Sequence, residues 1–208
     1  MGHPQPFLQR FHGEVTAHDR MQMFRHKPVT IWLTGLSGAG KSTIAFELEQ
    51  QLASLGHACY VLDGDNIRHG LASDLGFDRK DRRENIRRVA HVAQLMNDAG
   101  LIVIAALISP MREDRAMARD IVGPSRFIET YLSASVDACA RRDPKGLYAR
   151  ARAGEIASFT GVSAPYEVPA DPELKIDTAM STPTESVAHI FSYLLDNCLM
   201  NTDCTERY

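Results

Sequence analysis

Short runs of apolar and β-branched residues alternate with helical patterns from residue 29 onward. Runs of this length, bounded by helices, are typical of strands that are buried on both faces. Strands that are connected through helices pair in parallel, and the helices cover both faces of the sheet. The pattern therefore predicts an α/β fold with a five-stranded, mostly parallel sheet flanked by helices on both faces. Its strands are 29–34, 58–62, 101–108, 126–132 and 174–176.

The segments between these strands carry apolar residues at helical spacing. Ile44, Leu48, Leu52 and Leu55 recur every three or four residues, which places them on one face of a helix that ends at Gly56. This helix would directly follow the first strand.

Two further helices are predicted from residues that cap a helix start. Asp81 and Glu84 have the spacing of a capping box, and we expect the helix they open to end at Gly100. Thr182 and Glu185 repeat that spacing and open the last helix.

The chain divides into one domain with peripheral segments. Residues 1–28 show no sustained periodicity, so we interpret them as an N-terminal extension or arm. One domain is expected over 29–197, followed by a tail at 198–208. Segment 143–173 is rich in Lys, Arg, Gly and Pro and is long for a connection, which predicts a mobile lid.

Composition and charge narrow the classes of function. The net charge of −3 over 208 residues gives no broad positive field, so we expect no nucleic-acid partner. The longest apolar run, 101–108, is far short of the ~20 residues that span a bilayer, so no membrane partner is expected. Four cysteines without a CxxC pair suggest neither a disulfide framework nor a zinc site, and a cytoplasmic location fits best. His12, His18 and His26 lack ligand spacing and are interpreted as solvated.

The segment Gly35 to Ser42 reads GLSGAGKS and matches GxxxxGK[ST] between a predicted strand and a predicted helix. Its glycines let backbone N–H groups converge on phosphate oxygens, and the helix that follows adds the positive end of its dipole. Lys41 would supply a mobile cation and Ser42 a hydroxyl for Mg²⁺. The alternative is a glycine-rich turn without a ligand. The position of the motif between a strand and a helix favours a P-loop NTPase fold that binds ATP.

The acidic residues beside this cradle indicate a kinase. The chain has no guanine-reading NKxD segment, and the strand 101–108 runs into Ser109 and Pro110 instead of an aspartate that would hold magnesium. Asp63 and Asp65 follow the second strand, at the edge of the sheet where ligands bind in open α/β folds. One carboxylate can order Mg²⁺ and accept a proton from an acceptor hydroxyl, while the other orients the acceptor. Alternatively, Asp63 caps the next helix and Asp65 is solvated.

The predicted lid carries cations that could close over a transferring phosphoryl group, stabilise its charge and exclude water. A solvated basic helix is the alternative for each of them. These residues are Arg141, Arg142, Lys145, Arg150 and Arg152.

From residue 29 to about residue 190 the chain resembles the adenylyl-sulfate kinases, a family of P-loop kinases. Seven motifs carry the resemblance in order and spacing. They are GLSGAGKST at 35–43, DGDNIRHGL at 63–71, LGF at 75–77, DRRENIRR at 81–88, ISP at 108–110, RRDPKGLYARAR at 141–152 and GEIASFTGVSAPYE at 154–167.

The resemblance implies transfer of the γ-phosphoryl group of MgATP to the 3'-hydroxyl of adenosine 5'-phosphosulfate. Two alternatives stay open: a related kinase for another small hydroxyl compound, and a regulatory module that binds a nucleotide without turnover. The resemblance also implies a homodimer and an ATP sulfurylase that supplies the substrate.

The family motifs assign a role to each residue that they match. In the acceptor site, Phe77 and Phe159 would sandwich the adenine. Arg68 and Arg82 would offer forked donors to the sulfate or phosphate. Ser109 is a position at which a phosphorylated form is known in the family, but direct in-line transfer does not require a phosphoserine. The implied catalytic residues are Asp63, Lys41, Lys145 and Ser109, and the metal-binding residues are Ser42 and Asp63. The implied ATP-binding residues are Gly35, Leu36, Ser37, Gly38, Ala39, Gly40, Lys41, Ser42, Thr43 and Arg141. The implied acceptor-binding residues are Asp65, Asn66, Arg68, Phe77, Arg82, Asn85, Ile108, Ser109, Lys145, Phe159 and Thr160.

Overall fold

The computed structural model describes residues 11, 13–143 and 145–199. Most of the expected N-terminal extension lies among the described residues, but residues 1–10 and His12 do not. Of the expected tail, only Cys198 and Leu199 are described.

Five strands form one sheet in the order β2-β3-β1-β4-β5, and every neighbouring pair is parallel. This confirms the predicted α/β architecture and the P-loop fold. Each strand lies within two residues of the predicted bounds. The strands are β1 Thr30–Thr34, β2 Cys59–Asp63, β3 Ile102–Ala106, β4 Phe127–Ser133 and β5 Leu174–Asp177.

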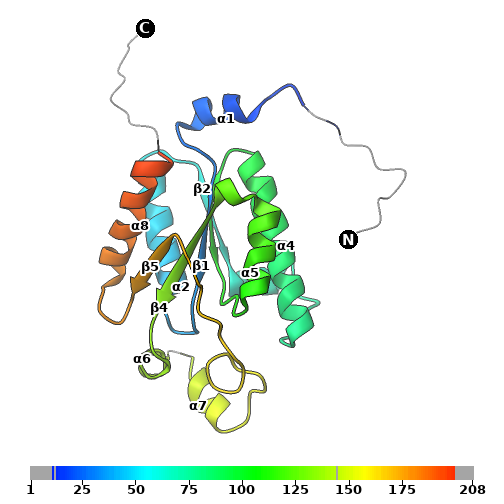
Figure 1. The fold of residues 1–208 in the computed structure, drawn as a ribbon, viewed down its shortest axis with the longest axis vertical. Coiled ribbons are helices and arrows are strands. Elements are labelled where there is room, and N and C mark those ends of the chain that lie inside the picture. The colour runs from blue at the N-terminus through cyan, green and yellow to red at the C-terminus, as the bar shows by residue number, and fades with distance from the viewer. Residues whose placement is uncertain (1–10, 12, 144, 200–208) are drawn as a thin grey trace.

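Helices cover both faces of the sheet, as the alternation of strands and helices predicts (Figure 1). The helices α2 (Lys41–Ser54) and α8 (Pro183–Asn197) lie on one face, and α4 (Arg79–Asp98) and α5 (Arg112–Val122) lie on the other (Figure 1). The shorter helices are α1 (Ala17–Phe24), α3 (Gly64–His69), α6 (Val136–Arg142) and α7 (Leu147–Arg152), with a 3-10 turn at Pro124–Arg126.

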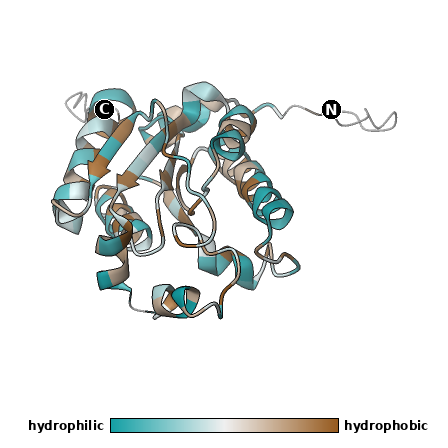
Figure 2. Ribbon diagram, turned by 60° about the horizontal axis from the view of Figure 1, so that its bottom comes forward, coloured by the Kyte–Doolittle hydropathy of each residue, from teal (hydrophilic) through white to brown (hydrophobic). Residues whose placement is uncertain are grey.

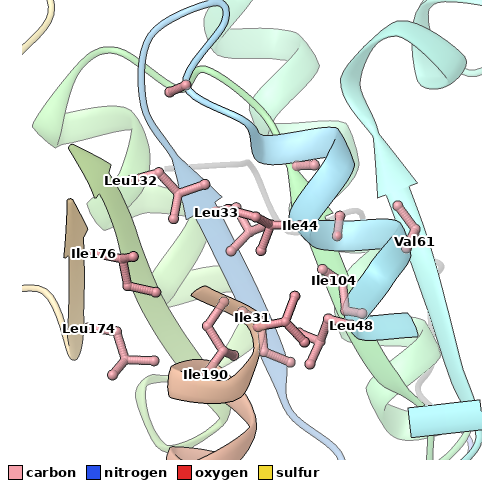
Figure 3. Packing of buried hydrophobic residues seen from close by; sticks show 14 of the residues in the cluster. Ile31, Leu33, Ile44, Leu48, Val61, Ile104, Leu132, Leu174, Ile176 and Ile190 are labelled. Atoms are coloured by element: carbon pink, nitrogen blue, oxygen red, sulfur yellow. The ribbon is translucent and has the colours of Figure 1, made fainter. Parts of the chain in front are cut away.

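Two hydrophobic clusters pack between the sheet and its helices, one on each face of the sheet. In Figure 3, Ile44 and Leu48 of α2 and Ile190 of α8 pack against Ile31 and Leu33 of β1. Along the flanking helices, Figure 2 shows hydrophobic and hydrophilic residues close together, as expected for helices with one buried face. Among the residues described, no helix has both the length and the apolar character needed to cross a bilayer.

Two helix starts were predicted from capping boxes, and one prediction is wrong. Thr182 and Glu185 form the expected box at α8. At α4, however, Asp78 is the N-cap, and its carboxylate accepts the Asp81 N–H at 2.8 Å. The Asp81 carboxylate instead accepts the N–H of Gly76, so Asp81 fixes the loop that precedes the helix.

The segment before β1, which contains α1 and His26, lies at the end of the sheet where the strands begin (Figure 1). His26, interpreted from the sequence as solvated, is fully buried. One of its ring nitrogens lies 2.9 Å from the Gly100 carbonyl oxygen, and the other lies 3.2 Å from Nδ1 of His57. Burial lowers the pKa of His26, so a neutral imidazole is favoured at this position.

Candidate active site

A cavity of about 1430 Å³ lies at the carboxyl ends of the strands, between the glycine-rich loop, α3, the start of α4 and the predicted lid. Figure 1 shows α6 and α7 at this same end of the sheet, where the strand arrows point. All the residues assigned to the site from the sequence line this cavity except Gly35, Leu36 and Arg141.

The glycine-rich loop wraps the start of α2, whose N-cap is Gly40. Gly38 has a φ of +77°, and a Cβ at this position would lie 2.9 Å from the Cys139 carbonyl oxygen. A larger residue would therefore push the loop away from α6, so both the conformation and the packing require glycine here.

Lys41 is buried beneath this loop. Its ammonium donates to the carbonyl oxygens of Gly35 at 2.9 Å and Leu36 at 2.7 Å. Burial lowers the pKa of Lys41 to about 8, and the negative groups nearby, including Asp63 and Asp65, offset part of this shift. The cation is thus held inside the cradle at a position from which it can turn towards a phosphate.

This pKa predicts how nucleotide affinity depends on pH. Free Lys41 loses its proton as the pH rises through about 8, whereas a lysine that contacts a triphosphate stays charged. Binding of ATP above that pH must therefore take up a proton. We expect the Kd for a non-hydrolysable ATP analogue to be constant below pH 7 and to rise about tenfold per pH unit well above pH 8. Calorimetric titration in buffers of different ionisation enthalpy measures both effects, and a pH-independent Kd would contradict them.

Ser42 and Asp63 face each other across the start of α2 and the end of β2. The Ser42 hydroxyl donates to Oδ2 of Asp63 at 2.7 Å. Oδ1 of Asp63 accepts the N–H groups of Asp65 at 3.0 Å and Asn66 at 3.3 Å, so Asp63 also caps α3. The capping alternative is therefore correct for one oxygen, while the other oxygen lies beside the cradle. A hydroxyl and a carboxylate oxygen this close form a donor set that suits Mg²⁺, which prefers oxygen ligands and keeps few protein contacts.

Asp65 and Lys145 form an ion pair across the mouth of the cavity, from α3 to the lid. Both side chains are more than half exposed, so the pair contributes little to stability. The ion pair raises the pKa of Lys145, which keeps this side chain charged. A substrate that enters between the two residues would exchange these contacts for its own.

The residues predicted for the acceptor line the opposite side of the cavity. Phe77 is 62% exposed, and the Arg68 guanidinium lies 4.3 Å from its ring centroid. Asn85 is only 5% exposed, and its Oδ1 has no hydrogen-bond partner in the structure. Buried polar atoms are nearly always paired, so this oxygen indicates where a ligand donor would bind.

Arg82 has a different environment from the anion fork expected from the sequence. Its three nitrogens donate to the Phe77 carbonyl at 2.6 Å, the Thr160 hydroxyl at 2.8 Å and the Ser158 carbonyl at 2.6 Å. Three of its five N–H groups are thus occupied by the protein. Arg82 joins the loop that carries Phe77 to the lid segment that carries Phe159, and two N–H groups are left for a ligand.

Phe159 lines the cavity from the lid and is almost fully buried. Its ring packs edge-on against Tyr148, with 5.0 Å between the ring centroids. Phe77 and Phe159 therefore contribute to one cavity from two different elements. The sandwich itself stays a prediction.

Ser109 follows β3 in a strained conformation, with a φ of +38°. Its hydroxyl accepts the indole N–H of Trp32 at 3.1 Å, and its carbonyl accepts a donor of the buried Arg115 at 2.7 Å. The neighbouring Ile108 carbonyl accepts the Thr34 hydroxyl at 2.7 Å. This network fixes the loop beside the acceptor residues, and a catalytic role for the Ser109 hydroxyl stays a prediction.

Arg141, expected to bind ATP, is exposed and lies outside the lining of the cavity, whereas Arg142 belongs to it. Consecutive residues on a helix point about 100° apart, so the two side chains leave α6 in different directions. Arg142 donates to both the carbonyl and the hydroxyl of Thr178, beyond the end of β5. A contact between Arg141 and ATP stays a prediction, and Arg142 is a further candidate for the nucleotide because it lines the cavity.

The cavity also contains residues that sequence reasoning did not assign to the site. These are chiefly Phe46, His69, Asp143, Glu155, Ile156, Thr178, Ser181, Pro183 and Ser186. Most come from the start of α8, the turn after β5 and the lid, which are far from the cradle in sequence. Four of them fall within the family motifs, which were a usable signal for these residues: His69, Asp143, Glu155 and Ile156.

Comparisons with known proteins agree with this geometry. The family model for adenylylsulphate kinase matches residues 27–177. The adenylyl-sulfate kinase of Geotalea daltonii is 51% identical over 189 residues, which is 91% of this chain and 93% of that protein. The structure of the Mycobacterium tuberculosis APS kinase CysC in complex with AMPPNP and APS is 46% identical, with a TM-score of 0.79 over 81% of this chain and 98% of that chain. A gluconokinase from Sinorhizobium meliloti, 17% identical with a TM-score of 0.52 over 83% of this chain and 98% of that chain, shares the fold alone. The chain belongs to the adenylylsulphate kinase family.

Proposed function

We propose that the protein transfers the γ-phosphoryl group of ATP to the 3'-hydroxyl of adenosine 5'-phosphosulfate, giving ADP and 3'-phosphoadenosine 5'-phosphosulfate. The observation that carries the proposal is that one cavity is lined both by the phosphate cradle and by the acceptor set Arg68, Phe77, Asn85 and Phe159. A donor and an acceptor bound there would share one enclosed space.

On the donor side, the loop amides and the positive end of α2 would hold the phosphates, and Lys41 would move from the loop carbonyls to the transferring group. Ser42 and Asp63 would hold Mg²⁺, which neutralises charge on the phosphate oxygens when it is bound. Arg142 would approach the nucleotide from the end of α6.

On the acceptor side, Phe77 and Phe159 would stack on the adenine, and aromatic stacking contributes roughly 1–3 kcal/mol per base. Arg68 and the two free N–H groups of Arg82 would meet the phosphosulfate. Asn85 would supply an acceptor for a donor of the ligand through its unpaired Oδ1.

Phosphoryl transfer requires the 3'-hydroxyl to lose a proton as its oxygen attacks in line. We assign Asp63 as the base because its Oδ2 lies beside Ser42, at the cradle. Asp65 would orient the acceptor, and Lys145 would contact the transferring group once their ion pair opens. The oxygen–phosphorus bond to ADP breaks as the new bond forms, so no phosphoserine at Ser109 is needed.

The oligomeric state, the metabolic partner and the location are also parts of the proposal. A homodimer and a sulfurylase that supplies the substrate rest on the family resemblance. A cytoplasmic location is supported by the cysteines that the structure describes, because Cys59, Cys139 and Cys198 are all free thiols.

Mass spectrometry of the reaction products tests the proposed function. With ATP and adenosine 5'-phosphosulfate, we expect stoichiometric ADP and a product heavier by one phosphoryl group, with negligible turnover of nucleosides or sugar acids. Preferred phosphorylation of a sugar acid would favour a related kinase, since such a substrate needs no aromatic sandwich. Nucleotide binding without any product would favour a regulatory module. Either result would overturn the proposal.

A further inference from the structure

Tyr148 lies in the first turn of α7 and is 2% exposed, although the lid around it is largely polar. Its hydroxyl donates to the Ser37 carbonyl, in the phosphate cradle, at 2.8 Å. The Tyr148 N–H donates to Oδ2 of Asp143 at 2.7 Å, which fixes the backbone of the residue. Burial raises the pKa of Tyr148, so the phenol stays a hydrogen-bond donor at any physiological pH.

The same side chain also touches the acceptor side of the cavity. Its ring packs edge-on against Phe159, an arrangement that aromatic pairs favour. The Phe159 N–H in turn donates to the Ser163 hydroxyl at 2.9 Å, so Phe159 has little freedom to move separately. Tyr148 therefore links Phe159, the predicted wall of the acceptor site, to the loop of the phosphate cradle.

A second contact between the lid and the cradle lies beyond Phe159. Gly161 has a φ of +89°, and a Cβ built there would lie 3.0 Å from Cδ2 of Leu36. The lid thus meets two successive cradle residues, Leu36 and Ser37, with Phe159 between the two contact points in the sequence. The segment that carries Phe159 is therefore joined to the phosphate loop at two points.

Tyr148 does not itself line the cavity. It has no surface available for either substrate, and its hydroxyl is used by a main-chain carbonyl. Its contribution to the reaction must therefore act through Ser37 and Phe159. Such a contribution matters because in-line attack requires the reacting atoms to approach within about 3–3.5 Å in the correct direction.

We propose that Tyr148 is a positioning residue that couples the two substrate sites: it fixes the distance between the phosphate cradle and the aromatic wall, so that occupation of either site favours binding at the other. This inference rests on the proposed function, since it requires a nucleotide in the cradle and an adenylyl compound against Phe159. Coupling of this kind is reciprocal, so each ligand must change the affinity of the other by the same factor.

Tyr148→Phe tests the proposal, because it keeps the ring against Phe159 and removes the hydroxyl that donates to Ser37. The measurement is the Kd of a non-hydrolysable ATP analogue with and without saturating adenosine 5'-phosphosulfate, and the Kd of the latter with and without the analogue. In the native protein, each ligand should lower the Kd of the other by about fivefold or more, and Tyr148→Phe should reduce this factor by about fivefold, the typical effect of one neutral hydrogen bond. The Kd of each ligand alone should change by about twofold or less.

Tyr193→Phe is the matched control, because it removes a phenolic hydroxyl from a partly buried tyrosine of α8 that does not line the cavity. It should leave the coupling unchanged. Gly161→Ala is a second test that does not depend on Tyr148, and it should reduce the coupling by straining the contact with Leu36. Native-like coupling in both Tyr148→Phe and Gly161→Ala, with both ligands still bound, would overturn this inference alone. Failure of the native protein to bind adenosine 5'-phosphosulfate would overturn the proposed function and this inference with it.

Discussion

Replacing Lys41 with methionine is expected to lower kcat/KM for ATP by about a thousandfold while the protein remains folded. The ammonium is placed inside the cradle by two carbonyl groups, and its charge would stabilise the phosphoryl group in transfer. Loss of one preorganised hydrogen-bond donor at a transition state typically lowers the rate by 10²–10³-fold, and loss of a cation that contacts a transferring phosphoryl group can lower it further. A coupled assay of ADP release, with and without adenosine 5'-phosphosulfate, measures the effect.

Stability should behave differently from activity in this variant. Burial disfavours the charged form of Lys41, so methionine, which keeps the aliphatic part of the side chain, removes a desolvation cost. The loss of two hydrogen bonds acts in the opposite direction. We expect a melting temperature within a few degrees of the native value. Lys175→Met, which changes an exposed lysine on β5, is the control. Near-native turnover by Lys41→Met would contradict the proposal that ATP binds in the cradle.

The strands and the cradle could be predicted because their signals are local. The Gly35 to Ser42 motif lies between a strand and a helix, and a stripe at helical spacing follows it. Hydrophobic periodicity reports burial on the face of an element, which depends little on distant residues. The family motifs then supplied candidate acceptor residues, which periodicity alone could not identify.

The partners of buried polar groups could not be predicted in the same way. Arg82 donates to Ser158 and Thr160, which are more than 70 positions away in the chain. His26 is buried because Gly100 and His57 meet it at the edge of the sheet. A residue type does not indicate which distant carbonyl will satisfy it, so an arginine interpreted as an anion ligand proved to join two loops as well.

Local rules also fail where two residues of the same type compete within one turn of a helix. Asp78 and Asp81 are both suitable N-caps, and the chain uses Asp78 because Asp81 is bound to Gly76. Arg141 and Arg142 are equally basic, and Arg142, which lines the cavity, donates to Thr178 beyond the end of β5. Both choices depend on contacts outside the helix concerned.

Replacing Asp63 with asparagine is expected to lower kcat by about a hundredfold or more and to leave binding of the free nucleotide largely intact. Asparagine can keep the cap on α3 through its side-chain oxygen, but it places a neutral amide beside Ser42 and removes the charge that would hold Mg²⁺ and take the proton. Single-turnover rates at saturating ATP and adenosine 5'-phosphosulfate separate this effect from binding.

Asp78→Asn is the matched control for this variant, because it makes the same change at another helix N-cap that does not line the cavity. Since asparagine is nearly as good a cap as aspartate, neither variant should lose much stability, and only Asp63→Asn should lose activity. Asp65→Asn distinguishes the two carboxylates: its side chain is exposed and paired with Lys145, so we expect a smaller loss in kcat and a higher KM for the acceptor. A larger loss of kcat in Asp65→Asn than in Asp63→Asn would indicate that Asp65 is the base and Asp63 orients the acceptor. A mild effect in both variants would show that neither carboxylate acts as the general base.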